Sequence, residues 1–217
     1  LGGFLPFLLD GVTGSGKTEV YLKLISQVLQ QQRQVLVLVP EIGLTPQLVR
    51  RFEQRLGVGV TLLHSNLAEG QREQAWLAGQ TGRDQLLLGT RSAVFTPLPR
   101  LGLVIVDEEH DLSFKQQEGF RYSARDLAVV RAQRSDCPVV LGSATPSLET
   151  RANADQGRYV RLDMPSRVHT RPMPEVHLLD RFPKLRDERY PERSRLGRCM
   201  HPGKCRGKVQ QTPRGYE

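Results

Sequence analysis

One short segment restricts the possible folds of this chain more than any other. Residues 11–18 read Gly-Val-Thr-Gly-Ser-Gly-Lys-Thr, which is the pattern G-x-x-x-x-G-K-T. The apolar run Phe7–Leu9 precedes it, and the helical pattern Thr18–Gln32 follows it. Glycines let backbone N–H groups surround a phosphate without Cβ clashes, and the start of a helix favours an anion. The segment therefore predicts a strand, a phosphate-binding loop and a helix.

The residues of this loop have the chemistry needed to bind a nucleoside triphosphate. Lys17 is expected to reach the β- and γ-phosphates, and the Thr18 hydroxyl to bind Mg²⁺. The alternative is a glycine-rich turn with an incidental lysine, and the flanking strand and helix argue against it. The predicted nucleotide-binding residues are Gly11, Thr13, Gly14, Ser15, Gly16, Lys17, Thr18 and Glu19.

A second apolar run, Leu103–Val106, ends in the acidic sequence Asp-Glu-Glu-His at residues 107–110. Ligands of open α/β sheets bind at the carboxyl ends of strands. We expect Asp107 to share the Mg²⁺ with Thr18, and Glu108 to orient or deprotonate the attacking water. A strand that merely ends in solvent is the alternative. The predicted catalytic residues are Lys17, Asp107 and Glu108.

A third apolar run, Val139–Leu141, leads into small hydroxyl residues. If this strand lies beside the previous one, Ser143 and Thr145 can bond the acidic cluster and sense the γ-phosphate. The alternative is a turn of small residues that ends where Ser147 caps a helix. The residues predicted to couple the nucleotide to the rest of the lobe are Glu109, His110, Ser143, Ala144 and Thr145.

Apolar runs alternate with amphipathic segments over the first 180 residues, which predicts an α/β fold with a mainly parallel sheet sandwiched by helices. Strands are expected at Phe7–Leu9, Val35–Val39, Val60–Leu63, Gln85–Leu88, Leu103–Val106, Val139–Leu141, Tyr159–Leu162 and Val176–Leu179. Helices are expected at Thr18–Gln32, Pro46–Leu56 with Thr45 as N-cap, Ser123–Arg134 and Ser147–Asp155. Trp76 lies in a helical pattern and is expected in the core, as is Cys137.

The positive charge is concentrated outside this predicted lobe. The 217 residues carry 31 basic and 23 acidic side chains, a formal charge of +8. Residues 1–180 hold 20 basic and 19 acidic side chains, whereas residues 181–217 hold 11 and 4. The tail is also rich in proline and poor in apolar residues, so we expect a domain at 1–180 and a largely disordered basic tail at 181–217.

Cysteine content and hydropathy set the cellular context. Three cysteines cannot form a closed set of disulfides, and no apolar run reaches the ~18 residues of a membrane span. These features predict a cytoplasmic protein with no membrane association. Cys199, His201 and Cys205 supply three possible ligands where structural zinc takes four, so no zinc is expected. Because the sequence begins at Leu1, we expect a fragment or a processed product.

The three motifs occur in the order typical of the first RecA-like lobe of a superfamily 2 helicase. More narrowly, the chain resembles the family of the bacterial primosomal protein N′, the replication-restart helicases, from about Phe4 to Asp180. The resemblance is carried by residues 11–21, 39–48, 63–67, 88–95, 107–117 and 119–125.

This resemblance implies ATP and Mg²⁺ as cofactors, and ATP hydrolysis coupled to 3′→5′ unwinding and primosome assembly. It also implies forked or single-stranded DNA, primosome proteins and single-strand-binding protein as partners. Residues 112–122 are similar to an aromatic-rich loop that couples DNA binding to hydrolysis, although ordinary packing is the alternative for its rings. The implied DNA contacts are Pro40, Gly43, Thr45, Gly89, Thr90, Arg91, Phe114, Lys115, Phe120, Arg121 and Tyr122.

The chain also departs from this family. The DNA-binding region that precedes the phosphate loop, the second lobe and the zinc-binding cysteine pairs are not found. We therefore expect weak nucleotide binding and little hydrolysis from the chain itself. A frameshifted reading, a truncated product and a divergent linker all remain open for the tail. Two other functions also remain open: another superfamily 2 translocase, and a non-enzymatic remnant anchored to DNA by its basic tail.

Overall fold

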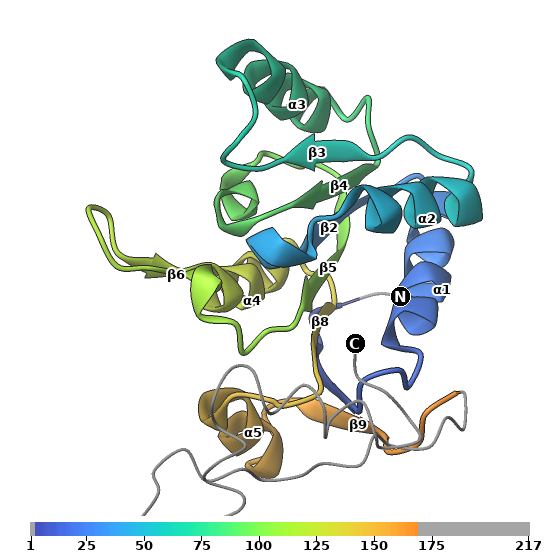
Figure 1. The fold of residues 1–217 in the computed structure, drawn as a ribbon, viewed down its shortest axis with the longest axis vertical. Helices are drawn as coiled ribbons and strands as arrows, with labels where there is room; N and C mark the ends of the chain where they lie inside the picture. The colour runs from blue at the N-terminus through green and yellow to red at the C-terminus, as the bar shows by residue number, and fades with distance from the viewer. Residues whose placement is uncertain (1–2, 169–217) are drawn as a thin grey trace, which may run out of the picture. The chain divides into compact units, whose positions relative to one another are not determined.

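The computed structural model describes residues 3–168, which form a seven-stranded parallel sheet in the order β3-β4-β2-β5-β8-β1-β9 (Figure 1). The strands are β1 (Pro6–Gly11), β2 (Gln34–Leu38), β3 (Thr61–Leu63), β4 (Leu86–Gly89), β5 (Leu101–Asp107), β8 (Val139–Ser143) and β9 (Val160–Met164). A separate antiparallel hairpin consists of β6 (Lys115–Gln116) and β7 (Tyr122–Ser123).

Helices cover both faces of the sheet, with α1 and α2 on one side and α4 on the other (Figure 1). The α-helices are α1 (Lys17–Gln30), α2 (Pro46–Leu56), α3 (Glu69–Thr81), α4 (Ala124–Arg134) and α5 (Leu148–Asp155). Short 3-10 helices are η1 (Glu41–Gly43), η2 (Arg91–Phe95) and η3 (Leu112–Phe114). The predicted α/β sandwich is confirmed. No helix in residues 3–168 is long and apolar enough to cross a bilayer.

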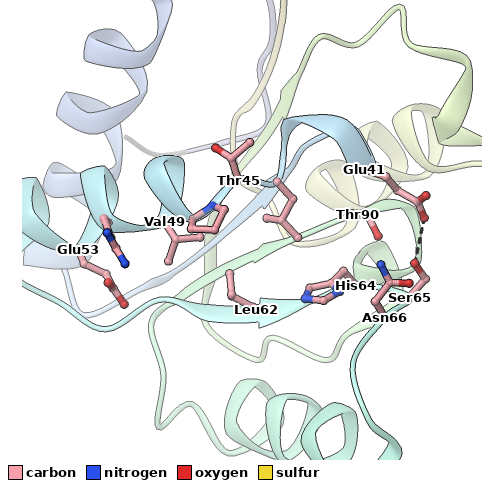
Figure 2. A pocket seen from close by; sticks show the side chains of 12 residues that line it. Glu41, Thr45, Val49, Glu53, Leu62, His64, Ser65, Asn66 and Thr90 are labelled. Carbon is pink, nitrogen blue, oxygen red and sulfur yellow. Dashed lines mark hydrogen bonds between the residues drawn. The ribbon is translucent and has the colours of Figure 1, made fainter.

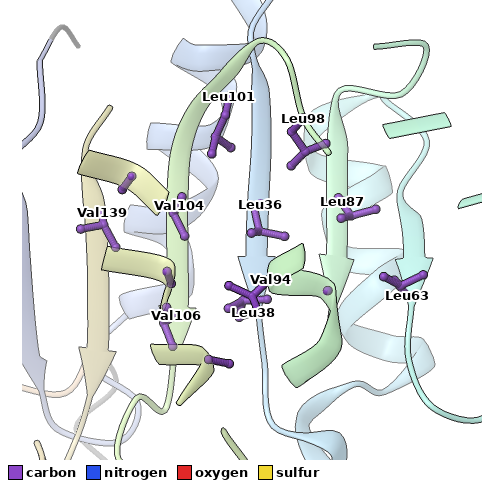
Figure 3. Packing of buried hydrophobic residues seen from close by; sticks show 14 of the residues in the cluster. Leu36, Leu38, Leu63, Leu87, Val94, Leu98, Leu101, Val104, Val106 and Val139 are labelled. Carbon is purple, nitrogen blue, oxygen red and sulfur yellow. The ribbon is translucent and has the colours of Figure 1, made fainter. Parts of the chain in front are cut away.

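The core has two layers because successive side chains of a strand point to opposite faces of the sheet. Val35 and Val37 of β2 join the cluster under α1 and α2. Leu36 and Leu38 join the cluster under α3, α4 and η2 (Figure 3). Full burial of one such side chain contributes about 1.5–3 kcal/mol. The apolar runs that form β2, β4, β5 and β8 are therefore buried on both faces, whereas the edge strand β9 is mostly exposed.

Local sequence signals determine where three of the helices begin. The Oγ1 of Thr45 accepts a hydrogen bond from the Leu48 N–H at 3.3 Å and caps α2, as predicted. Ser123 and Ser147 cap α4 and α5 in the same way. Gly57, with φ 67°, ends α2 in the left-handed region that favours glycine.

Seven of the eight predicted strands are present, and the eighth, Val176–Leu179, lies outside the described residues, as does the predicted tail. Cys137 is buried as expected. The prediction for Trp76 is wrong, because its side chain is 37% exposed. Helix α3 buries the small side chains Ala75 and Ala78 instead, which leaves the indole on its outer side.

Candidate functional site

The phosphate loop connects β1 to α1 at the carboxyl edge of the sheet. Gly14 and Gly16 have φ angles of 79° and 95°, which a residue with a Cβ rarely adopts. The Lys17 Nζ donates a hydrogen bond to the Gly11 carbonyl at 2.7 Å, so the lysine folds back over the loop. The Ser15 hydroxyl is buried and has no partner among the described residues. The loop is thus shaped for a ligand that supplies further hydrogen bonds.

The end of β9 and the residues after it lie beside this loop. The sequence did not predict this contact. The Val12 N–H donates to the Met164 carbonyl at 3.3 Å, and the Val168 N–H donates to the Gly14 carbonyl at 3.0 Å. A Cβ added to Gly16 would lie 3.1 Å from the Val168 side chain. The loop is therefore held between the start of α1 and the segment that comes after β9.

Glu19 is the member of the predicted nucleotide set whose side chain is engaged elsewhere. Its carboxylate pairs with Arg51 at 2.6 Å and with Arg55 at 2.7 Å, both on α2. These guanidinium groups lower the pKa of Glu19. The side chain therefore links α1 to α2, and its prediction as a nucleotide contact has no support from this geometry.

Asp107 ends β5 two strands away from the phosphate loop, with β8 between them. Its Oδ1 accepts a hydrogen bond from the Tyr21 hydroxyl at 2.9 Å. Burial raises the pKa of Asp107, although Tyr21 opposes this shift. Gly142 on β8 makes the contact possible, because a Cβ there would lie 1.7 Å from the tyrosine oxygen. Sequence reasoning assigned no role to Tyr21 or Gly142, whose contact joins segments 121 positions apart.

Glu108 combines an unusual backbone with a perturbed carboxylate. Its φ of 48° places a non-glycine residue in the left-handed region. Partial burial and the charge of Asp107 raise its pKa, while Lys17 and His110 oppose the shift. A carboxylate with a raised pKa accepts a proton more readily near neutral pH. The side chain is half-exposed, so water can reach it.

The predicted coupling residues come together where β5 and β8 end side by side. The His110 Nδ1 and the Ser143 Oγ lie 2.8 Å apart. The same hydroxyl accepts a hydrogen bond from the Thr145 N–H at 3.0 Å. The backbone of Ala144 opposes the rise in the pKa of Glu108. The acidic cluster and the small-residue turn are therefore directly connected.

Glu109 points away from the phosphate loop into a buried network. Its carboxylate accepts hydrogen bonds from the Ser147 N–H at 2.7 Å and the Thr150 hydroxyl at 2.8 Å, both at the start of α5. The Arg125 guanidinium on α4 lies 3.4 Å away. Sequence reasoning missed Arg125 and Thr150, and only the N-cap role of Ser147 was foreseen.

The donor set at this edge fits a magnesium ion. Asp107, Glu108 and the Thr18 hydroxyl are hard oxygen donors, and the two carboxylates are only partly compensated by Lys17. Within residues 3–168 no three metal-ligating side chains gather. Mg²⁺ bound with a nucleotide needs only one or two carboxylates, because phosphates and water supply the other oxygens. The three possible zinc ligands of the tail lie outside the described residues.

Two of the predicted DNA contacts line one hollow at the carboxyl ends of β2, β3 and β4. Thr45 and Thr90 both face this hollow, which has a volume of about 400 Å³ (Figure 2). Pro40, Gly43 and Gly89 lie in the adjoining segments, at η1 and at the end of β4. Hydroxyl groups and N–H groups at strand ends are the types that contact a phosphate backbone.

The segment after β3 contributes to the same hollow and was not predicted to do so. His64, Ser65 and Asn66 line it opposite α2 (Figure 2). The Ser65 hydroxyl donates to the Glu41 carboxylate at 3.2 Å and so links this segment to η1. The sequence signal was present, since 63–67 is one of the family-like stretches.

Arg91 connects this region to the β6–β7 hairpin. Its Nη1 donates to the Ser113 carbonyl at 3.1 Å and to the Lys115 carbonyl at 3.2 Å. The guanidinium therefore orients the hairpin, and both Lys115 and Arg121 remain exposed on it.

The aromatic residues of this segment divide into one core side chain and a surface group. Phe114 is 1% exposed, so the prediction that it stacks on DNA is wrong. Phe120 is 76% exposed, and its ring centroid lies 5.8 Å from that of Tyr122. Phe95, which sequence reasoning missed, contacts Tyr122 edge to face at 4.9 Å. Three neighbouring rings thus form a surface suited to stacking.

Comparison with known sequences gives a consistent result. Residues 5–154 match the DEAD/DEAH box helicase family. The chain is 54% identical to the replication restart protein PriA of Haemophilus influenzae, over 76% of this chain and 23% of that protein. The PriA protein of Bacillus subtilis is 50% identical over 83% of this chain and 22% of that protein. The chain therefore spans about a quarter of the length of these relatives.

The PriA protein of Synechocystis is 48% identical over 97% of this chain and 26% of its own length. A match of this extent continues into residues 181–217, so the prediction that the resemblance ends near Asp180 is wrong. The tail is similar to part of at least one relative, which argues against a frameshift as its origin.

Solved structures share the fold. A RecG structure bound to a three-way DNA junction superposes with a TM-score of 0.54 and 24% identity, over 78% of this chain and 21% of that one. The structure of the helicase MrfA bound to DNA and AMPPNP superposes with a TM-score of 0.54 and 13% sequence identity. The match covers 75% of this chain and 25% of that one. At such identities these likenesses establish the architecture alone.

Proposed function

The chain belongs to the DEAD/DEAH box helicase family, and from this premise we propose that it is the ATP-binding lobe of a DNA helicase that acts in replication restart. The observation that carries the proposal is one shared edge of the sheet. The phosphate loop with Lys17 lies there, as do Asp107 and Glu108, whose carboxylates are partly uncompensated. The hollow lined by Thr45 and Thr90 lies at the carboxyl ends of the neighbouring strands.

At this edge each side chain has a distinct task in ATP hydrolysis. Lys17 leaves the Gly11 carbonyl to contact the β- and γ-phosphates, and the loop N–H groups hold the same oxygens. Thr18 and Asp107 would hold Mg²⁺, which would neutralise charge on the phosphates when bound. Glu108 accepts a proton from the attacking water, a role that its raised pKa suits. His110 and Ser143 link this carboxylate to β8.

Single-stranded DNA is proposed to lie over the hollow and the hairpin. Thr45, Thr90 and the N–H groups around them would contact phosphates. Phe120 and Tyr122 would stack on bases, each worth ~1–3 kcal/mol by alanine substitution. Arg91 acts mainly by orienting the hairpin, since its guanidinium donates to the Lys115 carbonyl of β6 and to the Ser113 carbonyl of the preceding η3.

The complete protein is proposed to unwind forked DNA in the cytoplasm and to assemble with primosome proteins and single-strand-binding protein. These properties rest on the similarity to PriA proteins, of which this chain covers about a quarter. Residues 3–168 supply the phosphate loop and the carboxylates of the proposed ATP site. We therefore propose that this lobe by itself binds ATP weakly and hydrolyses little.

A direct test measures binding of a fluorescent ATP analogue with Mg²⁺, and ATP hydrolysis with and without forked DNA, for the wild type and Glu108→Gln. We expect both proteins to bind the analogue and the variant to lose whatever hydrolysis the wild type has. Absence of nucleotide binding in the folded wild type would contradict the proposal. DNA-stimulated hydrolysis at the level of an intact helicase would contradict the proposal that this lobe by itself hydrolyses little.

A second candidate function is a non-enzymatic DNA-binding protein, favoured by the charge of residues 181–217, with 11 basic and 4 acidic side chains. In that case, deletion of 181–217 should abolish DNA binding and its dependence on salt. If the lobe itself binds DNA, the shortened chain should retain binding that is lost on substitution of Phe120 and Tyr122 by alanine.

A further inference from the structure

The carboxylate of Glu109 is fixed in place by two different helices. Its side chain is 0% exposed. Ser147 donates to it from both its N–H, at 2.7 Å, and its hydroxyl, at 3.1 Å, and the Thr150 hydroxyl donates at 2.8 Å. The Arg125 Nη1 lies 3.4 Å away and also donates to the Ser147 hydroxyl at 2.8 Å. A buried carboxylate requires such partners, so Glu109 cannot move without α4 and α5.

The backbone of Glu108 is held by this anchored neighbour. A φ of 48° is unfavourable for a non-glycine residue, so surrounding contacts must maintain it. The Glu109 N–H donates to the Gly142 carbonyl at 3.0 Å, and the Asp111 N–H donates to the Glu108 carbonyl at 2.9 Å. Anchoring Glu109 on both its backbone and its carboxylate therefore fixes the direction of the Glu108 side chain.

Arg125 joins this anchor to the hairpin. It is the second residue of α4, directly after β7, and its side chain is 9% exposed. The partner strand β6 follows η3. Arg91 donates to one carbonyl of η3, that of Ser113, and to the Lys115 carbonyl of β6. A displacement of the hairpin by a ligand would thus move the start of α4 and, through Arg125, the position of Glu109.

We propose that the Arg125–Glu109 pair carries the coupling between nucleic-acid contact at the hairpin and the nucleotide site at Glu108. Arg125 is in this view a positioning residue, because it acts on Glu108 through Glu109 and contacts neither ligand. The inference rests on the proposed function and adds to it the route by which DNA regulates the nucleotide site. A purely structural ion pair would stabilise the lobe without linking the two sites.

Thermodynamic coupling tests the proposal without requiring turnover. The Kd of a fluorescent, non-hydrolysable ATP analogue with Mg²⁺ is measured with and without saturating oligothymidylate, on the full 217-residue chain. We expect DNA to change the wild-type Kd by about fivefold or more, the usual range of coupling between sites. We call the Kd measured without DNA divided by the Kd measured with DNA, or its inverse when DNA weakens binding, the coupling ratio. In Arg125→Gln this ratio should fall to about one, while the Kd without DNA changes less than about twofold.

Arg131→Gln is the matched control on the same helix. Arg131 is also partly buried, but it donates to the carbonyls of Val94 and Thr96 instead of a carboxylate. This variant should lose stability and keep the wild-type ratio. The double variant Arg125→Gln/Glu109→Gln removes the uncompensated buried charge that Arg125→Gln leaves. It should therefore recover stability and remain uncoupled.

The outcomes separate this inference from the proposed function. A wild type that binds both ligands with a ratio of one overturns the coupling and leaves the proposed function standing. Wild-type coupling retained in Arg125→Gln or in the double variant also overturns it. A folded wild type that binds neither nucleotide nor DNA overturns the proposed function, and the inference with it.

Discussion

Two regions that meet at the end of β5 differ in how far their buried carboxylates are compensated by hydrogen bonds and positive charges. On the side of the phosphate loop, burial raises the pKa of Asp107 and Glu108, and Lys17 only partly compensates them. On the side of α4 and α5, the carboxylate of Glu109 accepts hydrogen bonds from several donors and is fully buried. The difference teaches that carboxylates remain partly uncompensated where we propose that a ligand completes the site. They are fully paired where they hold the helices of the lobe together.

The largest expected effect comes from removing the buried carboxylate of Glu109, which α4 and α5 share. Glu109→Ala leaves Arg125 buried without this partner and removes the acceptor of Ser147 and Thr150. Breaking a buried pair in this way costs about 3–5 kcal/mol. Urea unfolding followed by circular dichroism measures the loss. A cost below about 1 kcal/mol would mean that the network is not what holds these helices.

Removal of the Lys17 ammonium group beside Asp107 and Glu108 should weaken nucleotide binding and leave the stability of the fold nearly unchanged. Lys17→Ala is expected to weaken binding of an ATP analogue about 10- to 100-fold, since a charge-assisted hydrogen bond contributes roughly 1.5–3 kcal/mol. Its one described hydrogen bond, to the Gly11 carbonyl, is worth little to the fold. Isothermal titration and the Tm together check both parts. A large drop in Tm with unchanged affinity would reverse the assignment of the two regions.

A smaller effect distinguishes the network from ordinary helix capping. Ser147→Ala removes an N-cap of α5 and a donor to Glu109, whereas Ser123→Ala removes only the N-cap of α4. Loss of a cap costs about 1 kcal/mol. Ser147→Ala should therefore exceed Ser123→Ala in urea unfolding. Equal costs would show that the hydroxyl contributes nothing to the network.

The smallest expected effect is a gain in stability that depends on pH. Asp107→Asn keeps an acceptor for Tyr21 and removes a carboxylate whose pKa is raised above its ordinary value of 3.8. A raised carboxylate pKa favours the folded state at low pH, and that benefit is lost as the pH rises through the folded pKa. The variant should thus match the wild type near pH 3 and have a Tm a few degrees higher at pH 7. An equal difference at both pH values would rule out ionisation as the cause.

The sequence predicted those parts of the molecule that depend on neighbouring residues. The phosphate loop, the carboxyl edge after Val106 and the caps at Thr45, Ser123 and Ser147 follow from local patterns, and the structure contains each of them. The approach of three strand ends to one edge followed from parallel pairing.

Contacts between distant segments could not be predicted in this way. Nothing near Arg125 in the sequence says that it reaches Glu109, and the clearance between Gly142 and Tyr21 depends on how α1 packs on the sheet. Composition also could not separate Phe114, which enters the core, from Phe120, which remains outside. Both rings lie in one short segment, and only the turn of η3 decides which one is buried.

The hydrogen bond from Val168 to the Gly14 carbonyl has a mechanical consequence. It ties the chain four residues after the end of β9 to the proposed phosphate-binding loop through one backbone contact. Tension applied to the chain beyond this point would load the loop directly, and a loop tightened around a ligand would pull back on that chain. The segment after β9 and the loop between β1 and α1 are thus directly connected through their backbones.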